Sequence, residues 1–193
     1  MRRAISVLLA LLGSPAIADA ICDDLWLSRN AVMDRAGFCF ESPLGLALFD
    51  NKDCFGTDVT LTSPEEELLA AIQDYEEELA CAVDTSATSL EIGDLDIRLR
   101  LSSIPVRDST ESACLGWQGR RALLLTGTYE GARVSGSVEE GDTILSQHQS
   151  YEDSFGRFWS YYTVTTRIGL PSPVIAAGWT YENLFETCDK IAG

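Results

Sequence analysis

SPEEELLAAIQDYEEELAC, residues 63–81, contains the clearest helix signal in the 193-residue chain. Ser63 is expected to be the N-cap, Pro64 the first helical residue and Glu66 the acid of a capping box, which is typical of a helix start. Apolar residues then recur at spacings of four, seven and eleven and share one helix face: Leu68, Ile72, Tyr75 and Leu79. Cys81 closes the helix near that face, so the stretch predicts a buried helix that is held by a disulfide.

A second helix is predicted upstream, over residues 25–36. Asp23 and Asp24 provide its N-caps, and Gly37 stands where a helix commonly ends in a left-handed residue. A bridge between Cys22 and Cys81 would tie the two helices together. The N-terminal half is therefore expected to be a disulfide-stapled two-helix module over residues 21–83.

Residues 1–20 predict a secretory signal peptide. Arg2 and Arg3 precede an apolar run over residues 4–12, and small residues lead to a cleavage site after Ala20, with Ala18 as the alternative. The apolar run is too short to span a bilayer. We therefore expect an exported protein of the periplasm or the extracellular space, with no membrane span in the mature chain.

Six cysteines follow this segment, and an even number in an oxidising compartment predicts three disulfides. Six cysteines allow fifteen connectivities, which spacing alone does not resolve. Four cysteines fall before residue 82 and two after residue 113, so pairing within each half is favoured. The expected pairs are Cys22–Cys81, Cys39–Cys54 and Cys114–Cys188. The chain has no C-x-x-C motif and a single histidine, so no metal site and no cofactor is expected.

The pattern changes after residues 84–89, a small polar stretch that is expected to be a linker. Residues 95–101 alternate apolar and polar side chains, which predicts a half-buried strand and, as the weaker alternative, an amphipathic helix. Residues 104–107 are a further strand candidate. Short apolar segments between glycine-rich turns predict five more strands, over residues 122–126, 133–138, 143–146, 159–165 and 175–180. Residues 90–193 are thus expected to form a β-rich domain, either a small barrel or a sandwich.

The net charge limits the classes of partner. The whole chain carries −16, and loss of Arg2, Arg3 and Asp19 with the signal peptide changes this to −17. Such a charge repels nucleic acids and anionic lipid surfaces, so no nucleic-acid partner is expected. It suits a cationic protein, or it serves solubility alone.

LWLSRNAVMDRAGFCF, residues 25–40, resembles the YARHG domain of secreted bacterial proteins, over residues 22–81. The family pattern is matched by Leu25-Trp26, Arg29-Asn30, Val32, Arg35, Gly37, Phe38 and Phe40. Met33, Asp34 and Ala36 replace its characteristic Tyr, Ala and His. The pairing with a cysteine-containing β region also resembles a bacterial family of unknown function in which the two occur together.

Three later segments resemble bacterial Src-homology-3-like domains: VSGSVEEGDTI (134–144), FWSYYTV (158–164) and AGWTYENLF (177–185). Their order agrees with that family, although its Arg-x-Gly-Pro opening is missing and Thr126-Gly127-Thr128 stands near that place. The resemblance implies an α+β protein: the helical module, then a small all-β barrel at residues 115–188. Both resemblances imply binding modules of the cell envelope.

Four residues are candidate ligand contacts: Arg29, Asn30, Tyr162 and Tyr181. Arg29 and Asn30 lie mid-helix, where tying the segment at residues 38–49 to the helix is the favoured role and ligand binding the alternative. Tyr162 and Tyr181 are expected opposite the core-facing Trp159, Tyr161 and Trp179, and so are the groove candidates. His148 lies between two glutamines near a turn and is expected to be a surface residue, so no catalytic constellation is identified.

Three functional hypotheses follow. The first is an exported, non-catalytic binding module of the bacterial envelope that recognises a peptide or a cell-wall fragment. The second is an acidic inhibitor or partner of a cationic secreted hydrolase, favoured by the charge. The third is a glycoside hydrolase with paired carboxylates, one of which would need a raised pKa in a cleft.

Overall fold

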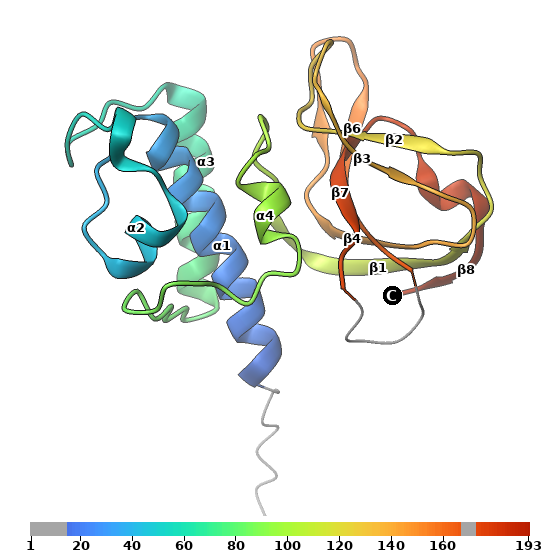
Figure 1. Ribbon diagram of the computed structural model, residues 1–193, viewed down its shortest axis with the longest axis horizontal. Helices are drawn as coiled ribbons and strands as arrows, with labels where there is room; N and C mark the ends of the chain where they lie inside the picture. Colours follow the sequence, from blue (N-terminus) through green and yellow to red (C-terminus); the bar gives the residue numbers. More distant parts are fainter. Residues whose placement is uncertain (1–14, 167–172) are drawn as a thin grey trace, which may run out of the picture.

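The computed structural model describes residues 15–166 and 173–193, and in it a layer of helices packs against a curved antiparallel sheet (Figure 1). The helices, including two short 3-10 turns, are α1 (Pro15–Arg35), α2 (Pro43–Leu48), η1 (Asn51–Asp53), α3 (Ser63–Glu78), α4 (Leu95–Arg98) and η2 (Leu184–Thr187). Most of the predicted signal peptide, residues 1–14, lies outside the described residues. Helix α1 already includes the predicted cleavage position at Ala20.

The strands all lie in the second half of the chain. They are β1 (Arg107–Trp117), β2 (Ala122–Leu125), β3 (Val134–Val138), β4 (Thr143–His148), β5 (Tyr151–Glu152), β6 (Phe158–Thr165), β7 (Ala176–Thr180) and β8 (Cys188–Ala192). The five segments predicted after residue 120 thus correspond to β2, β3, β4, β6 and β7 within two residues at each end. β1, β5 and β8 were not predicted.

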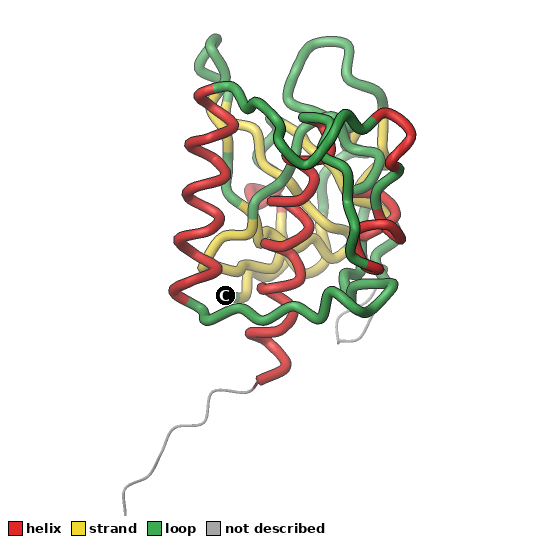
Figure 2. The backbone as a smooth tube through the Cα atoms, turned by 90° about the vertical axis from the view of Figure 1, so that its left-hand side faces the viewer, coloured by secondary structure: helices red, strands yellow, loops and turns green. Residues whose placement is uncertain are grey.

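Helices α1 and α3 form the outer layer and lie side by side in front of the sheet (Figure 2). Leu25 of α1 and Ile72 of α3 are buried together with Val106, which directly precedes β1. The disulfide Cys22–Cys81 joins α1 to the chain just beyond α3. The apolar face predicted for residues 68–79 therefore packs against the first helix, as expected from its spacing.

The end of α1 and the start of α3 lie close to the sequence signals, but the start of α1 does not. Helix α1 begins at Pro15, so Asp23 and Asp24, the predicted N-caps, lie inside it. Helix α3 begins one residue early: Thr62 is the N-cap, and its backbone N–H donates to Glu65 Oε2 at 2.8 Å. The capping box is therefore formed by Thr62 and Glu65, and the predicted pair, Ser63 and Glu66, was wrong by one position. Helix α1 ends at Arg35, and Gly37 has φ +85°, the left-handed conformation predicted for it.

Short α2 closes the other side of α1. Phe40 stacks on Phe49 with ring centroids 4.7 Å apart, and both are buried with Trp26. The disulfide Cys39–Cys54 closes the loop around α2. Ser42 caps the helix by accepting a hydrogen bond from the Gly45 backbone N–H at 3.1 Å. A six-residue helix has little intrinsic stability, so the aromatic packing and the disulfide hold it in place.

The sheet is open. Its strand order is β3-β2-β7-β6-β4-β1-β8, with β5 paired to β6 off this path. β3 and β8 are the two ends of that order, so the sheet is not closed into a barrel, and the predicted small barrel is corrected to a curved, eight-stranded antiparallel sheet. The third disulfide, Cys114–Cys188, joins β1 to β8, which also pair directly. The three disulfides are the pairs favoured from the sequence.

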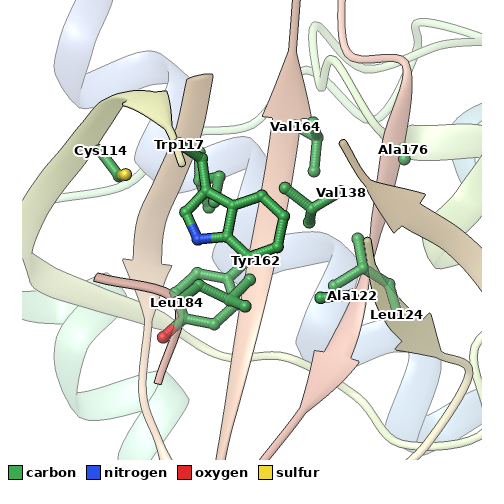
Figure 3. Close-up of a cluster of buried hydrophobic side chains, with 10 residues drawn as sticks. Cys114, Trp117, Ala122, Leu124, Val138, Tyr162, Val164, Ala176 and Leu184 are labelled. Atoms are coloured by element: carbon green, nitrogen blue, oxygen red, sulfur yellow. The ribbon is translucent and has the colours of Figure 1, made fainter. Parts of the chain in front are cut away.

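The inner side of the curved sheet contains an apolar core (Figure 3). Its buried members include Trp117, Leu124, Ile144, Tyr162 and Val164. Burying such side chains stabilises the fold by roughly 1.5–3 kcal/mol each. The other side of β6 and β7 has its own cluster, in which Trp159, Tyr161 and Trp179 are almost fully buried, as predicted for these three.

Residues 95–101 do not form the predicted strand. Residues 95–98 form helix α4, and the Arg98 backbone N–H donates to Asp94 O at 3.0 Å. The alternating pattern implied an exposed Arg98, but this side chain is 6% exposed and engaged in an ion pair. That contact overrides the local alternation, so the amphipathic-helix alternative was the better one. Of residues 104–107, only Arg107 is in a strand.

Candidate functional site

A hollow of about 430 Å³ lies where helix α1 meets the outer side of the sheet. We call it the junction hollow. Its lining combines apolar and ionisable side chains from α1, from the segment before α4 and from strands β1, β4 and β6; the ionisable ones are Asp24, Glu91, Asp94, Arg107, Glu111 and His148. A concave site with a few convergent polar groups is the usual form of a ligand site.

Asp24 is the centre of the charged groups behind this hollow. Its Oδ1 lies 2.6 Å from Arg98 Nη1, and its Oδ2 lies 3.1 Å from His148 Nε2. All three side chains are at least nine-tenths buried. Since one comes from α1, one from α4 and one from β4, this network connects the helical layer to the sheet.

The rest of the Arg98 guanidinium is also engaged. Its Nη2 donates to Ser28 Oγ at 2.8 Å and to Pro105 O at 3.1 Å. Ser28 Oγ itself donates to Pro105 O at 2.8 Å. A buried arginine with several partners is held in one orientation, so Arg98 fixes the wall of the hollow rather than reaching into it.

Tyr161 and Asp94 form a second buried pair beside this network. Tyr161 Oη donates to Asp94 Oδ2 at 2.6 Å. The ring of Tyr161 also contacts the His148 ring edge-to-face, with centroids 5.0 Å apart. The sheet is thus linked to the start of α4 by one short hydrogen bond.

These contacts set the protonation states. Burial alone would raise the pKa of Asp24, but Arg98 and His148 outweigh it and hold that pKa well below its usual range. Burial would lower the pKa of Arg98, but Asp24 and Asp94 raise it. Burial and the nearby charge of Asp94 raise the pKa of the Tyr161 hydroxyl well above its usual value. Asp24 is therefore ionised and Tyr161 neutral at pH 7.

The exposed rim of the junction hollow is acidic. Glu91 and Glu111 are exposed there, and Glu111 accepts hydrogen bonds from Arg107 Nη2 at 3.1 Å and from Gln147 Nε2 at 2.6 Å. Carboxylates at the mouth of a part-apolar hollow favour a ligand with ammonium groups. Among the described residues, no group of three or more His, Cys, Asp or Glu side chains is placed to hold a metal ion.

His148 was wrongly expected at the surface. It ends strand β4 and is 6% exposed. Within residues 15–166 and 173–193, the hydrogen bond of its ring is the one to Asp24, 124 positions away in sequence. The neighbouring Gln147 and Gln149 suggested exposure because nothing local reveals so distant a partner.

Arg29 and Asn30 lie outside the junction hollow. Arg29 Nε forms an ion pair with Glu76 Oε2 of α3 at 2.8 Å, and Asn30 Nδ2 donates to Trp26 O at 2.8 Å, one turn back in α1. Both residues thus hold the helical layer together, although Arg29 binds α3 and not the segment at residues 38–49 that was expected. The structure gives neither residue a place in a hollow.

The two tyrosine candidates differ in exposure. Tyr162 is 5% exposed and stacks near Phe185 in the inner core, because both sides of β6 are covered. We therefore do not retain it as a groove residue. Tyr181 is 55% exposed, packs edge-to-face on Trp159 at 5.2 Å and lies 5.7 Å from the Arg157 guanidinium. Tyr181 therefore contacts Trp159 and does not lie opposite it, as had been predicted, and it does not line the junction hollow.

A smaller hollow of about 230 Å³ lies on the other side of Arg98, next to α2. It contains two carboxyl groups with opposite shifts: burial raises the pKa of Asp34, and hydrogen bonds from Lys52 lower that of Asp50. Arg35 in the same hollow donates from Nη2 to Leu101 O at 2.9 Å, which ties α1 to the chain after α4.

Two further hollows continue from the junction hollow along α4. A middle hollow of about 470 Å³ shares Gly93, Asp94 and Val174 with it. The last hollow of this row, the third when counted from the junction hollow, has a volume of about 190 Å³ and shares Ile97 and Arg100 with the middle hollow. The three hollows therefore adjoin one another and follow residues 91–100.

Comparison with known families divides the chain at the end of α3. A family model described as the YARHG domain matches residues 7–77, and one described as a domain of unknown function (DUF4453) matches residues 80–193. The second match covers more than half of the chain. The chain belongs to the DUF4453 family. No curated protein and no solved structure matches it.

The two matches confirm the predicted YARHG resemblance and place the junction hollow between the two regions. Asp24 lies in the YARHG region, and its partners Arg98 and His148 lie in the DUF4453 region. The likeness to Src-homology-3-like domains stays a prediction. No helix of the described residues is long and apolar enough to cross a membrane. The three disulfides and the YARHG domain are consistent with an exported protein.

No direct sequence signal marks Asp24, Arg98, Asp94 or Glu91 as site residues. Asp24 was identified only as a helix cap, and Arg98 was placed on the polar side of a strand. The one useful sign was the helical alternative for residues 95–101. In a helix, Arg98 would not share one exposed face with Asp96 and Arg100, as it does in a strand.

Proposed function

We propose that this protein is an exported, non-catalytic binding module of the bacterial cell envelope that recognises a peptide or a peptide-bearing cell-wall fragment. The observation that supports it best is the junction hollow itself. It is walled by a fixed, buried charge network and rimmed by Glu91 and Glu111, which suits a ligand with ammonium groups.

The state of the polar groups favours binding over chemistry. Asp24, Arg98 and Asp94 are each occupied by protein partners, and the cysteines are all in disulfides. Pre-organised groups that do not need to move on binding cost little conformational entropy. The predicted export signal and the order of the Src-homology-3-like motifs support the same proposal, because both are features of envelope binding modules.

The test is binding of two probes: insoluble peptidoglycan, by co-sedimentation, and the synthetic tetrapeptide Lys-Ala-Ala-Ala, by calorimetry. Leu145→Trp fills the junction hollow, because Leu145 lines it. Leu123→Trp is the matched control, since Leu123 is 46% exposed and lines none of the hollows described above. We expect Leu145→Trp to abolish binding and Leu123→Trp to leave it unchanged. Absence of binding to both probes at every ionic strength would refute the proposal.

A second candidate function is an acidic partner of a cationic secreted hydrolase. The net charge of −16 favours it, as does α3, which exposes Glu66, Glu67 and Asp74 and contains no lysine or arginine. Association with a basic lysozyme should then weaken steeply between about 0.05 and 0.5 M salt, as screening predicts. Salt-independent association would count against this candidate.

A further inference from the structure

Two arginines share the third hollow, which we call the arginine hollow. It is lined by Arg100, just after α4, by Arg133, just before β3, and by Ile97, Thr126, Val134 and Ser135. Both arginines are exposed. They are the only ionisable residues that line it.

The two guanidinium groups have no protein partner among the described residues. Five other arginines, in contrast, form ion pairs with carboxylates: Arg29, Arg98, Arg107, Arg121 and Arg157. The chain has 30 acidic residues against 14 lysines and arginines, so carboxylate partners for arginines are abundant in this protein. Two arginines without such a partner therefore stand out. Two unpaired cations that face one small hollow repel each other, and an anion between them would relieve that repulsion.

The backbone holds both arginines in place. The Thr126 N–H donates to Arg133 O at 2.8 Å, and the Arg100 N–H donates to Ile97 O at 3.0 Å. On the floor of the hollow, Ser135 Oγ donates to Ala177 O at 2.7 Å. The arginine side chains are thus the free donors of a hollow whose walls are fixed, and a planar guanidinium suits an oxyanion through paired hydrogen bonds.

We propose that the arginine hollow binds the C-terminal carboxylate of the peptide that occupies the junction hollow. Exposed Glu91 and Glu111 line one end of the three adjoining hollows, where Arg107 is paired with Glu111. Exposed Asp96 lines the middle hollow, and the unpaired Arg100 and Arg133 line the other end. Such a gradient orients an extended peptide, with its amino end at the acidic rim and its carboxyl end between the arginines. This inference rests on the proposed function and adds the direction of the ligand.

The test compares Lys-Ala-Ala-Ala with its C-terminal amide by calorimetry at low ionic strength. The wild-type protein should bind the free acid about tenfold more tightly, the size expected for one charge-assisted pair. Arg100→Gln and Arg133→Gln should each weaken binding of the free acid to the level of the amide. Arg120→Gln is the matched control, because Arg120 is exposed, has no ion pair among the described residues and lies outside the hollow.

Each outcome is informative. Equal binding of acid and amide by the wild type overturns the carboxylate site and leaves the proposed function standing. Failure of both peptides to bind removes the proposed function for this ligand class, and the inference with it. Inorganic phosphate serves as a third probe: if it binds in an arginine-dependent manner while the peptides show no preference, the hollow is a general anion site and the assignment to a peptide end is wrong.

Discussion

The two sides of the curved sheet are stabilised in different ways. The inner side buries an apolar cluster around Trp117 and Leu124 (Figure 3), and the Cys114–Cys188 disulfide joins β1 to β8 beside it. The outer side has an apolar cluster of its own around Trp159 and Trp179, and it also contacts α1 and α4 through buried charges centred on Asp24. Hydrophobic burial is non-directional, whereas a buried ion pair needs particular partners at particular distances.

This difference separates stability from recognition. An apolar core tolerates substitutions of similar size, so it fixes the fold without demanding a unique arrangement. The charge network adds less net stability but fixes how the helical layer sits on the sheet, and the junction hollow lies at that contact. The outer side of the sheet, where buried charges must be desolvated, is therefore the side that forms the junction hollow.

The largest effect on stability is expected from Asp24→Asn, which removes the central charge of the network on the outer side of the sheet. This change leaves buried Arg98 without its counter-charge, and breaking one partner of a buried pair costs about 3–5 kcal/mol. We expect the free energy of unfolding, measured by urea denaturation at pH 7, to fall by that amount. Asp23→Asn is the neighbouring control and should change it by less than about 0.5 kcal/mol, because burial raises the pKa of Asp23 and already disfavours its charge.

Acid should act through the same network. The pKa of Asp24 is lowered on folding, so its contribution to stability is complete above the unfolded value of about 3.9 and is lost as the pH falls below it. The difference in unfolding free energy between wild type and Asp24→Asn should therefore shrink from pH 5 to pH 2. A difference that stays constant over this range would mean that the ion pair does not stabilise the fold.

Ile144→Ala tests the inner side. The side chain is fully buried among apolar neighbours, and its truncation should cost about 2–4 kcal/mol. In contrast to the Asp24 effect, this cost should be equal at pH 7 and pH 4. Tyr162 is the ionisable member of the cluster, and burial raises its pKa further above this range, so it stays neutral. Urea denaturation at the two pH values, with exposed Leu123→Ala as the control, measures it.

The smallest expected effect is that of Tyr161→Phe. Loss of the 2.6 Å hydrogen bond to Asp94 should cost about 1.5–3 kcal/mol at pH 7. Because folding raises the pKa of Tyr161, its contribution is present below about pH 10 and is lost at higher pH. The variant should accordingly lose less stability than the wild type between pH 9 and pH 11. Thermal denaturation across that range would show whether the two curves converge.

Much of the fold was predictable because it depends on local signals. The turns around β2, β3, β4, β6 and β7, the apolar face of α3 and the end of α1 at Gly37 are all encoded within a few residues. An even number of cysteines in each half favoured pairing within the halves, although the first four cysteines still allowed three connectivities. Strands β1 and β8 were missed because β1 carries polar residues at its exposed centre and β8 is almost entirely exposed.

The site was not predictable for the opposite reason. Asp24 and His148 are 124 positions apart, and Arg98 reaches Ser28 across 70. The sequence around each residue suggested an ordinary local role: a helix cap for Asp24, a polar turn for His148 and an alternating strand for Arg98. Only the packing of α1 against the sheet brings them together, and Tyr162 was misplaced because the sequence does not show that both sides of β6 are covered.

The open ends of the sheet have a consequence for how copies of this protein behave at high concentration. Edge strands present unpaired backbone N–H and C=O groups that can template the addition of another chain. β8 carries Asp189 and Lys190, which oppose such addition, whereas β3 has the sequence VSGSV with no charge and a half-exposed Val134. Edge-to-edge self-association should therefore begin at β3, which makes this strand the one to protect when the protein is concentrated.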